Sequence, residues 1–251
     1  MVGKNQSAHV VNLHGRLFLI DCGEGTQVQM KRFGISKGRL DNILISHLHG
    51  DHVFGIFGML STMALDGRTA PLYIYAPRDF ASVLRFFMAH FGEGLKYEIT
   101  HIPLTMKEPE EIASFRHCRV IAFPLRHRID CYGFRIVYEK QPRKDSDEPV
   151  SKSFAYCSDT MAFPEEADWL RGTDVIYHEA TFADEHVDLA HRMYHSTARE
   201  AASVAAAAGA SKLVLGHFSS RYQTLDLLLS QAREVFPESY LAEDGLSFEI
   251  E

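Results

Sequence analysis

Short apolar runs rich in β-branched and aromatic residues recur along the whole chain, and stretches of helical periodicity separate them. This mixture of strand and helix patterns predicts an α/β architecture built on more than one sheet. The clearest helix begins after Thr197, which forms a capping-box pattern with Glu200, and ends at Gly209. Strands are predicted at residues 17–20, 43–45, 72–75, 97–102, 119–123, 132–138, 154–157, 175–177, 213–215 and 246–250, and helices at 26–33, 53–65, 79–91, 198–208 and 225–235.

Composition limits the classes of protein to which this chain can belong. A length of 251 residues with 46% hydrophobic residues allows a sizeable core, and we expect a single domain over residues 1–251. Charged residues and prolines gather at 139–153, which predicts an exposed loop there. No apolar run is long enough to cross a bilayer, no signal-peptide core opens the chain, and the four cysteines form no CxxC pair. We therefore expect a cytosolic protein, whose net charge of −7 restricts nucleic-acid contacts to a local site.

Four side chains of the kinds that bind metal ions follow the predicted strand at 43–45 within one short segment. His47 and His49 point the same way in an extended segment, and Asp51 and His52 open the next helix and turn toward the same spot. Imidazole and carboxylate ligands together suit zinc, manganese or iron better than calcium. Because a catalytic zinc usually takes three protein ligands and a water, this segment predicts a pair of metal ions with further ligands elsewhere.

Other predicted strands end on the same kinds of side chain, namely His127, Asp159, Glu179 and His217. Loops at the carboxyl ends of strands converge on one rim of an open sheet, so we expect these residues near the first cluster. Taken alone, a histidine such as His127 or His217 is more often a satisfied loop residue, and a lone Asp159 more often forms a cap or a turn. The cluster at 47–52 favours the metal interpretation for all of them, because a two-metal site needs ligands from elsewhere in the chain.

These residues also carry a resemblance to a known family. His47-Leu48-His49-Gly50-Asp51-His52 is the HxHxDH signature of the metallo-β-lactamase superfamily. Further segments resemble the ribonuclease Z family of tRNA 3′-processing endonucleases, and the similarity covers nearly the whole chain. They are residues 18–27, Ile45-Ser46, His178-Glu179-Ala180-Thr181, His195-Ser196-Thr197, and the segment from Gly216 to Tyr222. Two of these segments, His178-Glu179-Ala180-Thr181 (HEAT) and His195-Ser196-Thr197 (HST), are specific to this branch of the superfamily.

The resemblance implies an αββα four-layer sandwich, in which two mixed sheets lie face to face with helices outside. It also implies a homodimer in the cytoplasm that removes the 3′ trailer from precursor tRNA and leaves a 3′-hydroxyl, by attack of a metal-activated hydroxide. Two zinc ions per chain are implied, with manganese as the alternative. By matching position, one ion is held by His47, His49 and His127, the other by Asp51, His52 and His217, and Asp159 bridges them.

The resemblance assigns the general base to Asp51 and the protonation of the leaving group to His195 with Glu179. An imidazole held charged and oriented by a carboxylate is suited to give a proton to a departing hydroxyl. His195 also precedes the helix capped by Thr197, and we expect the free N–H groups at the start of that helix to accept a phosphate.

The sequence departs from the family in two places. Only five residues precede the segment matching residues 6–9, where the family has a strand and a glycine-rich turn. Residues 139–153 stand where the family carries a long arm that grips the tRNA body. Either the protein is a short variant or the sequence lacks residues of a longer protein, and we expect the second, because the loss of a first core strand exposes a sheet edge.

Two other functions stay open at this point. The short segment at 139–153 favours a metallohydrolase of the same fold that acts on small phosphodiesters or esters. The third alternative is a nucleic-acid binding module without catalytic activity, and metal analysis separates it from both enzymes.

Overall fold

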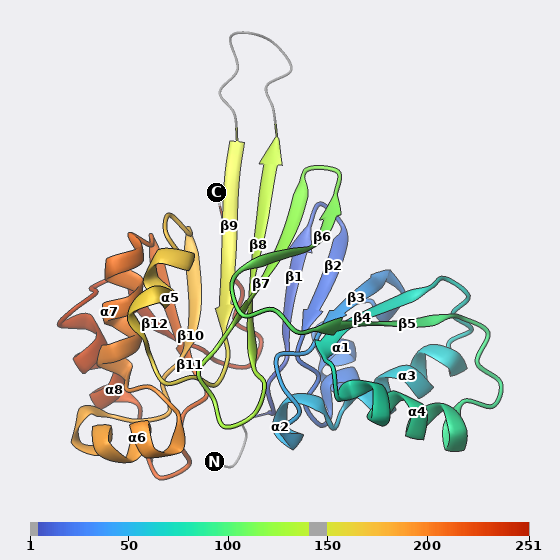
Figure 1. Ribbon diagram of the computed structural model, residues 1–251, viewed down its shortest axis with the longest axis horizontal. Coiled ribbons are helices and arrows are strands. Elements are labelled where there is room, and N and C mark those ends of the chain that lie inside the picture. The colour runs from blue at the N-terminus through green and yellow to red at the C-terminus, as the bar shows by residue number, and fades with distance from the viewer. Residues whose placement is uncertain (1–4, 141–149, 251) are drawn as a thin grey trace, which may run out of the picture. The chain divides into compact units, whose positions relative to one another are not determined.

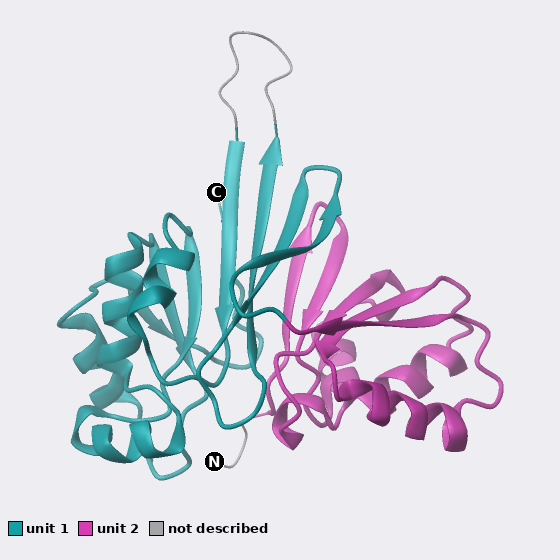
Figure 2. Cartoon of the chain, in the orientation of Figure 1, with its two compact units in different colours: residues 1, 106–251 teal, residues 2–105 magenta. Residues whose placement is uncertain are grey.

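The computed structural model describes residues 5–140 and 150–250. The chain divides into two compact units (Figure 2). Among the described residues, the N-terminal unit covers 5–105 and the C-terminal unit covers 106–140 and 150–250. Each unit is built on one mixed sheet with helices, as the alternation of strand and helix patterns predicts. No helix among the described residues is long and apolar enough to cross a membrane.

The N-terminal unit holds a five-stranded sheet in the order β1-β2-β3-β4-β5 (Figure 1). The first two strands pair antiparallel, and the others run parallel. Its core joins Ile43 and Ile74 of the sheet to Met59 and Phe87 of two helices. The strands are β1 (His9–Leu13), β2 (Arg16–Ile20), β3 (Leu40–Leu44), β4 (Leu72–Pro77) and β5 (Ile99–Leu104), and the helices are α1 (Thr26–Arg32), the 3₁₀ helix η1 (Lys37–Arg39), α2 (Gly50–Val53), α3 (Ile56–Leu65) and α4 (Phe80–Phe91).

The C-terminal unit holds a seven-stranded sheet in the order β12-β11-β10-β9-β8-β7-β6. Strands β6 to β9 pair antiparallel and β9 to β12 pair parallel, and α5, α7 and α8 pack beside the parallel part (Figure 1). The strands are β6 (Glu110–Phe115), β7 (Cys118–Pro124), β8 (Tyr132–Lys140), β9 (Val150–Cys157), β10 (Val175–Glu179), β11 (Lys212–Gly216) and β12 (Ser239–Leu241), and the helices are α5 (Pro164–Trp169), the 3₁₀ helix η2 (Asp184–His186), α6 (Val187–Met193), α7 (Ala198–Ala208) and α8 (Asp226–Arg233).

Helix α7 confirms the capping prediction at both ends. The Glu200 amide donates to the Thr197 hydroxyl at 3.2 Å, and the Thr197 amide donates to the Glu200 carboxylate at 2.8 Å. Gly209 ends the helix in the left-handed conformation, with φ of 68°. The buried alanines of α7 pack in the core of the C-terminal unit, so the start of the helix is fixed just after His195.

The prediction of an exposed loop at 139–153 is wrong for its two ends. Strand β8 continues through Lys140 and β9 begins at Val150, with Lys140 opposite Val150 and Glu139 opposite Ser151. Backbone pairing with the neighbouring strand extends the ladder despite the polar side chains, because polar residues are tolerated where they face water. The remaining residues, 141–149, lie outside the described part of the chain.

Other strand predictions also differ from the structure. The strand predicted at 246–250 is wrong, because that segment pairs with no strand among the described residues. A segment whose residues favour strands still forms no strand unless a neighbouring backbone supplies hydrogen bonds. Strands β1, β6 and β12 were not predicted. In β1 the polar residues obscure the pattern, and its pairing with β2 depends on a tight turn in which His14 and Gly15 have φ of 48° and 95°.

All four cysteines are free and buried. The sequence likewise gives no reason to expect a disulfide framework. Burial raises the pKa of Cys22 to about 12, and it raises the pKa of Cys157 as well. Because the thiolate is the reactive form, we expect native protein at pH 8 to react very slowly with 5,5′-dithiobis(2-nitrobenzoate) and guanidinium-unfolded protein to release four equivalents at once. Rapid release of one equivalent or more from the native protein would contradict this.

Candidate metal centre

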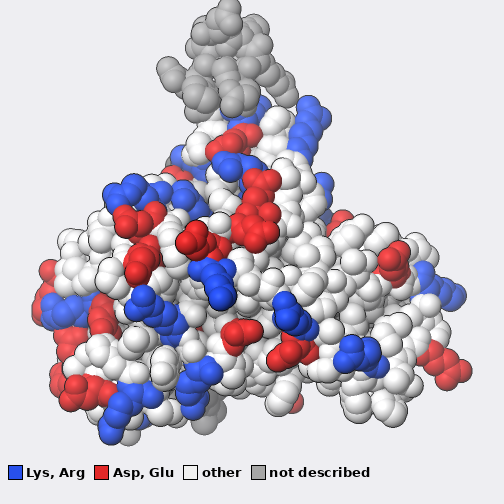
Figure 3. All heavy atoms as spheres, in the orientation of Figure 1, with Lys and Arg blue, Asp and Glu red and all other residues white. Residues whose placement is uncertain are grey.

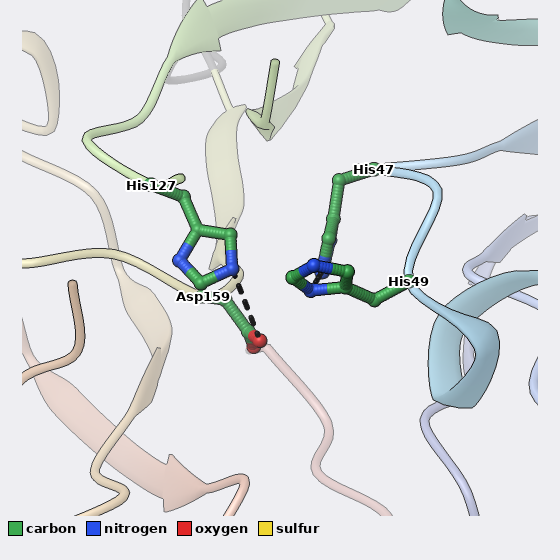
Figure 4. Close-up of side chains that lie close together, drawn as sticks. All are labelled: His47, His49, His127 and Asp159. Carbon is green, nitrogen blue, oxygen red and sulfur yellow. Dashed lines mark hydrogen bonds and ion pairs between the residues drawn. The ribbon is translucent and has the colours of Figure 1, made fainter. Parts of the chain in front are cut away.

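In the N-terminal unit, the segment after β3 brings four metal-binding side chains together. His47 Nε2 lies 3.0 Å from His49 Nδ1 (Figure 4), and the rings of His47 and His52 are 4.2 Å apart. The His52 Nε2 atom lies 3.6 Å from an Asp51 carboxylate oxygen. His49 is extended, and α2 begins immediately after it, so Asp51 and His52 fall in the first turn of a helix. The four residues therefore cluster as the spacing predicts.

A buried carboxylate, Asp21, orients this cluster. Its Oδ2 lies 2.7 Å from His52 Nδ1 and accepts from the Ser46 hydroxyl at 3.0 Å, while its Oδ1 accepts from the Ser46 amide at 2.8 Å. The Ser46 oxygen in turn lies 3.0 Å from His47 Nδ1. Contacts of this kind fix the tautomer and direction of metal-binding histidines. The sequence assigns no role to Asp21, although its position directly after a buried strand is the signal that marks Asp159.

Close backbone packing holds Asp21 against His52. The Cys22 amide donates to the His52 carbonyl at 2.8 Å, and the Gly55 amide donates to the Cys22 carbonyl at 2.8 Å. A Cβ on Gly55 would lie only 2.0 Å from the Gly23 carbonyl oxygen, so this contact requires glycine. Gly55 also separates α2 from α3, which is why the single helix predicted at 53–65 forms as two.

In the C-terminal unit, three strand ends bring His127, Asp159 and His217 together. The Asp159 carboxylate lies 3.9 Å from His127 Nε2 (Figure 4) and 3.2 Å from His217 Nε2. The other nitrogen of each ring is held in place: His127 Nδ1 donates to the Tyr194 carbonyl at 2.9 Å, and His217 Nδ1 lies 3.0 Å from the Thr181 hydroxyl. Both Nε2 atoms therefore face the carboxylate, as the rule for strand ends predicts.

Glu179 at the end of β10 is the centre of a buried network in the same unit. Its Oε1 lies 2.7 Å from His195 Nδ1 and accepts from the Thr160 amide at 3.0 Å. Its Oε2 accepts from the Thr181 amide and hydroxyl at 2.9 and 2.7 Å. Because Nδ1 of His195 is engaged, Nε2 is the nitrogen that remains for other partners. Polar atoms of His195, His217 and Asp159 all lie within 4.8 Å of one another.

Two roles in this network were not predicted. Thr160 and Thr181 connect Glu179 to the strand ends, and Thr181 closes the HEAT segment that carries the resemblance. At the start of α7, where free N–H groups are expected to accept a phosphate, the amides of Thr197, Ala198 and Glu200 are engaged by groups of the protein itself. A well-formed capping box consumes the donors that an anion would use.

The donor set of each unit fits a transition metal. Imidazole nitrogens and carboxylate oxygens face one another at short distance, and the second nitrogen of several rings is fixed by a neighbouring group, as in protein metal sites. The mixture of nitrogen and oxygen donors suits zinc, manganese or iron rather than calcium or magnesium.

The fold and this donor set define a member of the β-lactamase superfamily. Residues 16–218 match the family model described as the β-lactamase superfamily domain. Ribonuclease Z from Bacteroides fragilis is 36% identical over 97% of this chain and 93% of its own length, and ribonuclease Z from Acaryochloris marina is 33% identical over 98% and 92%. The crystal structure of the short form of human tRNase Z superimposes with a TM-score of 0.83 and 30% identity, and it covers 100% of this chain and 95% of its own.

The chain belongs to the ribonuclease Z family. Its two mixed sheets with helices form the metallo-β-lactamase fold that the sequence resemblance implies.

Proposed function

We propose that this protein is the metal-dependent endoribonuclease that removes the 3′ trailer from precursor tRNA and leaves a 3′-hydroxyl on the tRNA. Membership of the ribonuclease Z family over nearly the whole chain supports the substrate class. The observation that carries the proposal is the buried Glu179–His195 pair beside Asp159 and His217, because it supplies an oriented proton donor next to a metal-binding carboxylate. The protein would act in the cytoplasm, where its four buried thiols stay reduced.

We propose that the donor sets of the two units together bind two zinc ions, with manganese as the alternative. The predicted division is His47, His49 and His127 for one ion, Asp51, His52 and His217 for the other, and Asp159 shared between them. The short contacts within each unit support parts of this division, namely His47 beside His49, Asp51 beside His52, and Asp159 beside both His127 and His217. When bound, such a pair lowers the pKa of a water molecule so that it attacks phosphorus at neutral pH.

The side chains of this chain handle the protons of the reaction. Asp51, whose side chain is 42% exposed at the start of α2, is the proposed general base for the attacking water. Because the tRNA product carries a 3′-hydroxyl, the bond that breaks joins phosphorus to the ribose 3′ oxygen rather than to the 5′ oxygen. His195 is proposed to give its Nε2 proton to that oxygen, while Glu179 holds Nδ1 and stabilises the charged ring.

The charge distribution supports a local rather than a general contact with RNA. Lys and Arg lie among Asp and Glu on the face drawn in Figure 3, and the chain carries a net charge of −7. We propose that tRNA is the partner of the metal centre and that the chain forms a homodimer. Exposed apolar side chains on α4, namely Phe86, Met88 and Phe91, support a second copy as the partner of the N-terminal unit.

Comparing two substrates tests this function. We expect cleavage of a precursor tRNA transcript directly after the discriminator nucleotide, with far slower hydrolysis of bis(p-nitrophenyl) phosphate, and mature tRNA serves as the uncleaved control. We also expect about two metal ions per chain and loss of cleavage on chelation that added zinc reverses. Efficient ester hydrolysis without tRNA processing would instead identify a metallohydrolase of small phosphodiesters or esters. Fewer than one metal ion per chain would favour a binding module without catalytic activity.

A further inference from the structure

A second cluster of reactive side chains lies in the core of the C-terminal unit, and the proposed reaction does not use it. Cys157, Glu166 and His178 are all completely buried. One polar atom from each lies within 4.8 Å of the other two, and His178 Nε2 is 3.2 Å from a Glu166 carboxylate oxygen. Apolar side chains such as Ile176 and Leu170 share this core. Burying a carboxylate among apolar groups is costly, so this arrangement needs a compensating reason.

The positions of the three residues in the chain suggest that reason. Cys157 is the last residue of β9, and Glu166 lies in α5. The segment between them, residues 158–163, begins with Ser158 and carries Asp159. His178 stands beside Cys157 in the parallel ladder of β9 and β10. The three side chains thus join the two ends of the segment to the neighbouring strand, and we call them the buried clasp.

The segment closed by the buried clasp connects the two polar networks of this unit. The Thr160 amide donates to Glu179 at 3.0 Å, and the Thr160 carbonyl accepts from the Ser196 hydroxyl at 2.7 Å. The Thr160 hydroxyl accepts from the Arg126 amide at 3.0 Å, next to His127 in the chain. Movement of the segment would therefore displace Asp159, Glu179 and the loops that carry the histidines together.

His178 also acts directly on the strand that carries Glu179. Its Nδ1 donates to the Glu179 carbonyl at 2.7 Å, which directs Nε2 toward Glu166. Burial lowers the pKa of His178, but the carboxylates of Glu166 and Glu179 outweigh this and raise it above its ordinary value. The His178 imidazole and the Glu166 carboxylate therefore face each other in the core, 3.2 Å apart.

We propose that the buried clasp is a positioning device: Cys157, Glu166 and His178 fix the segment 158–163 and the end of β10, and so set Asp159 and Glu179 in place. The clasp touches no reacting atom, so its members are positioning residues. The inference builds on the proposed metal-dependent function. A metal ion is not needed to account for the cluster, since it offers three ligands and a closed structural zinc site takes four.

The variant Glu166→Gln tests the clasp, because it keeps the shape of the side chain and removes its charge. We expect metal to leave the purified protein at least about tenfold faster in the presence of a chelator, the scale of loss seen when groups behind metal ligands are changed. We also expect kcat for precursor tRNA to fall with little change in KM, because Glu179 and Asp159 are displaced rather than the RNA-binding surface. Cys157→Ala removes a smaller part of the clasp and serves where Glu166→Gln folds poorly.

The matched control is Val204→Ala, which removes buried volume from the same core on α7 and changes no member of the clasp. If Glu166 only stabilises the core, Glu166→Gln and Val204→Ala should increase the rate of metal release equally when they lower Tm equally. That result would overturn the proposal. If Glu166 and His178 act as one unit, the double variant Glu166→Gln with His178→Gln should lose no more metal than the worse single variant.

Metal counting separates the clasp from the other interpretations. A third metal ion in the wild-type protein that disappears in Glu166→Gln would overturn the proposal, since the cluster would then be a metal site. Metal release does not depend on the RNA substrate. If the wild-type protein does not cleave precursor tRNA but Glu166→Gln still releases metal faster than the wild type, the proposed function is contradicted. The positioning role is then still supported.

Discussion

The variant Asp159→Ala is expected to lose bound metal and, with it, cleavage of precursor tRNA. The Asp159 carboxylate is buried and lies 3.2 Å from His217 Nε2 and 3.9 Å from His127 Nε2, so its removal leaves two histidines of the C-terminal unit without their shared partner. Loss of a ligand should exceed the roughly 10–100-fold loss of affinity caused by changing an outer-shell group. Elemental analysis of the purified variant and a zinc competition titration measure this directly.

The exposed residue Asp130 in the same unit provides the control for Asp159. Asp130→Ala changes the net charge by the same amount and should retain the wild-type metal content and activity. A full complement of tightly bound metal in Asp159→Ala would show that the bridging assignment is incorrect.

The variant His195→Ala is expected to keep its metal and lose cleavage by about 10²–10⁴-fold, the usual contribution of a general acid. His195 is held by Glu179 at 2.7 Å through Nδ1, and its proposed role is to protonate the leaving oxygen through Nε2. Single-turnover cleavage of precursor tRNA, together with metal analysis of the same sample, measures both properties.

His90→Ala, at an exposed histidine of α4, is the matched control for His195→Ala and should behave as wild type. Loss of metal from His195→Ala would contradict its role as proton donor, because polar atoms of His195 lie within 4.8 Å of Asp159 and His217 and a ligand role is the alternative.

Much of the site could be predicted because its residues follow local rules. The cluster from His47 to His52 is contiguous in sequence, and the carboxyl ends of β7, β9, β10 and β11 each lead to a histidine or an acidic residue. Helix α7 was predicted with both ends correct, since its cap and its terminal glycine act within one turn of chain.

What could not be predicted depends on contacts between distant residues. Strand β12 has three residues and exists because β11 offers it a parallel partner, whereas residues 246–250 have a more strand-like composition and no such partner. Asp21 acquires its role only when it meets His52, 31 positions later, and Glu166 only when it meets His178. Hydrophobic patterns specify burial of apolar groups, but they contain little information about which polar groups are buried together.

The ladder between β8 and β9 has a consequence for how this chain tolerates change. Its register runs without a break from Phe134 opposite Tyr156 to Lys140 opposite Val150, and β9 leads directly to Asp159. The ladder therefore has seven paired positions from its Lys140–Val150 end to its Phe134–Tyr156 end, which lies near Asp159 in the chain. Since the cost of closing a loop grows only slowly with its length, insertions or deletions between Lys140 and Val150 leave that register unchanged. Changes of length between Lys140 and Val150 can thus accumulate while the backbone pairing that leads to Asp159 is preserved.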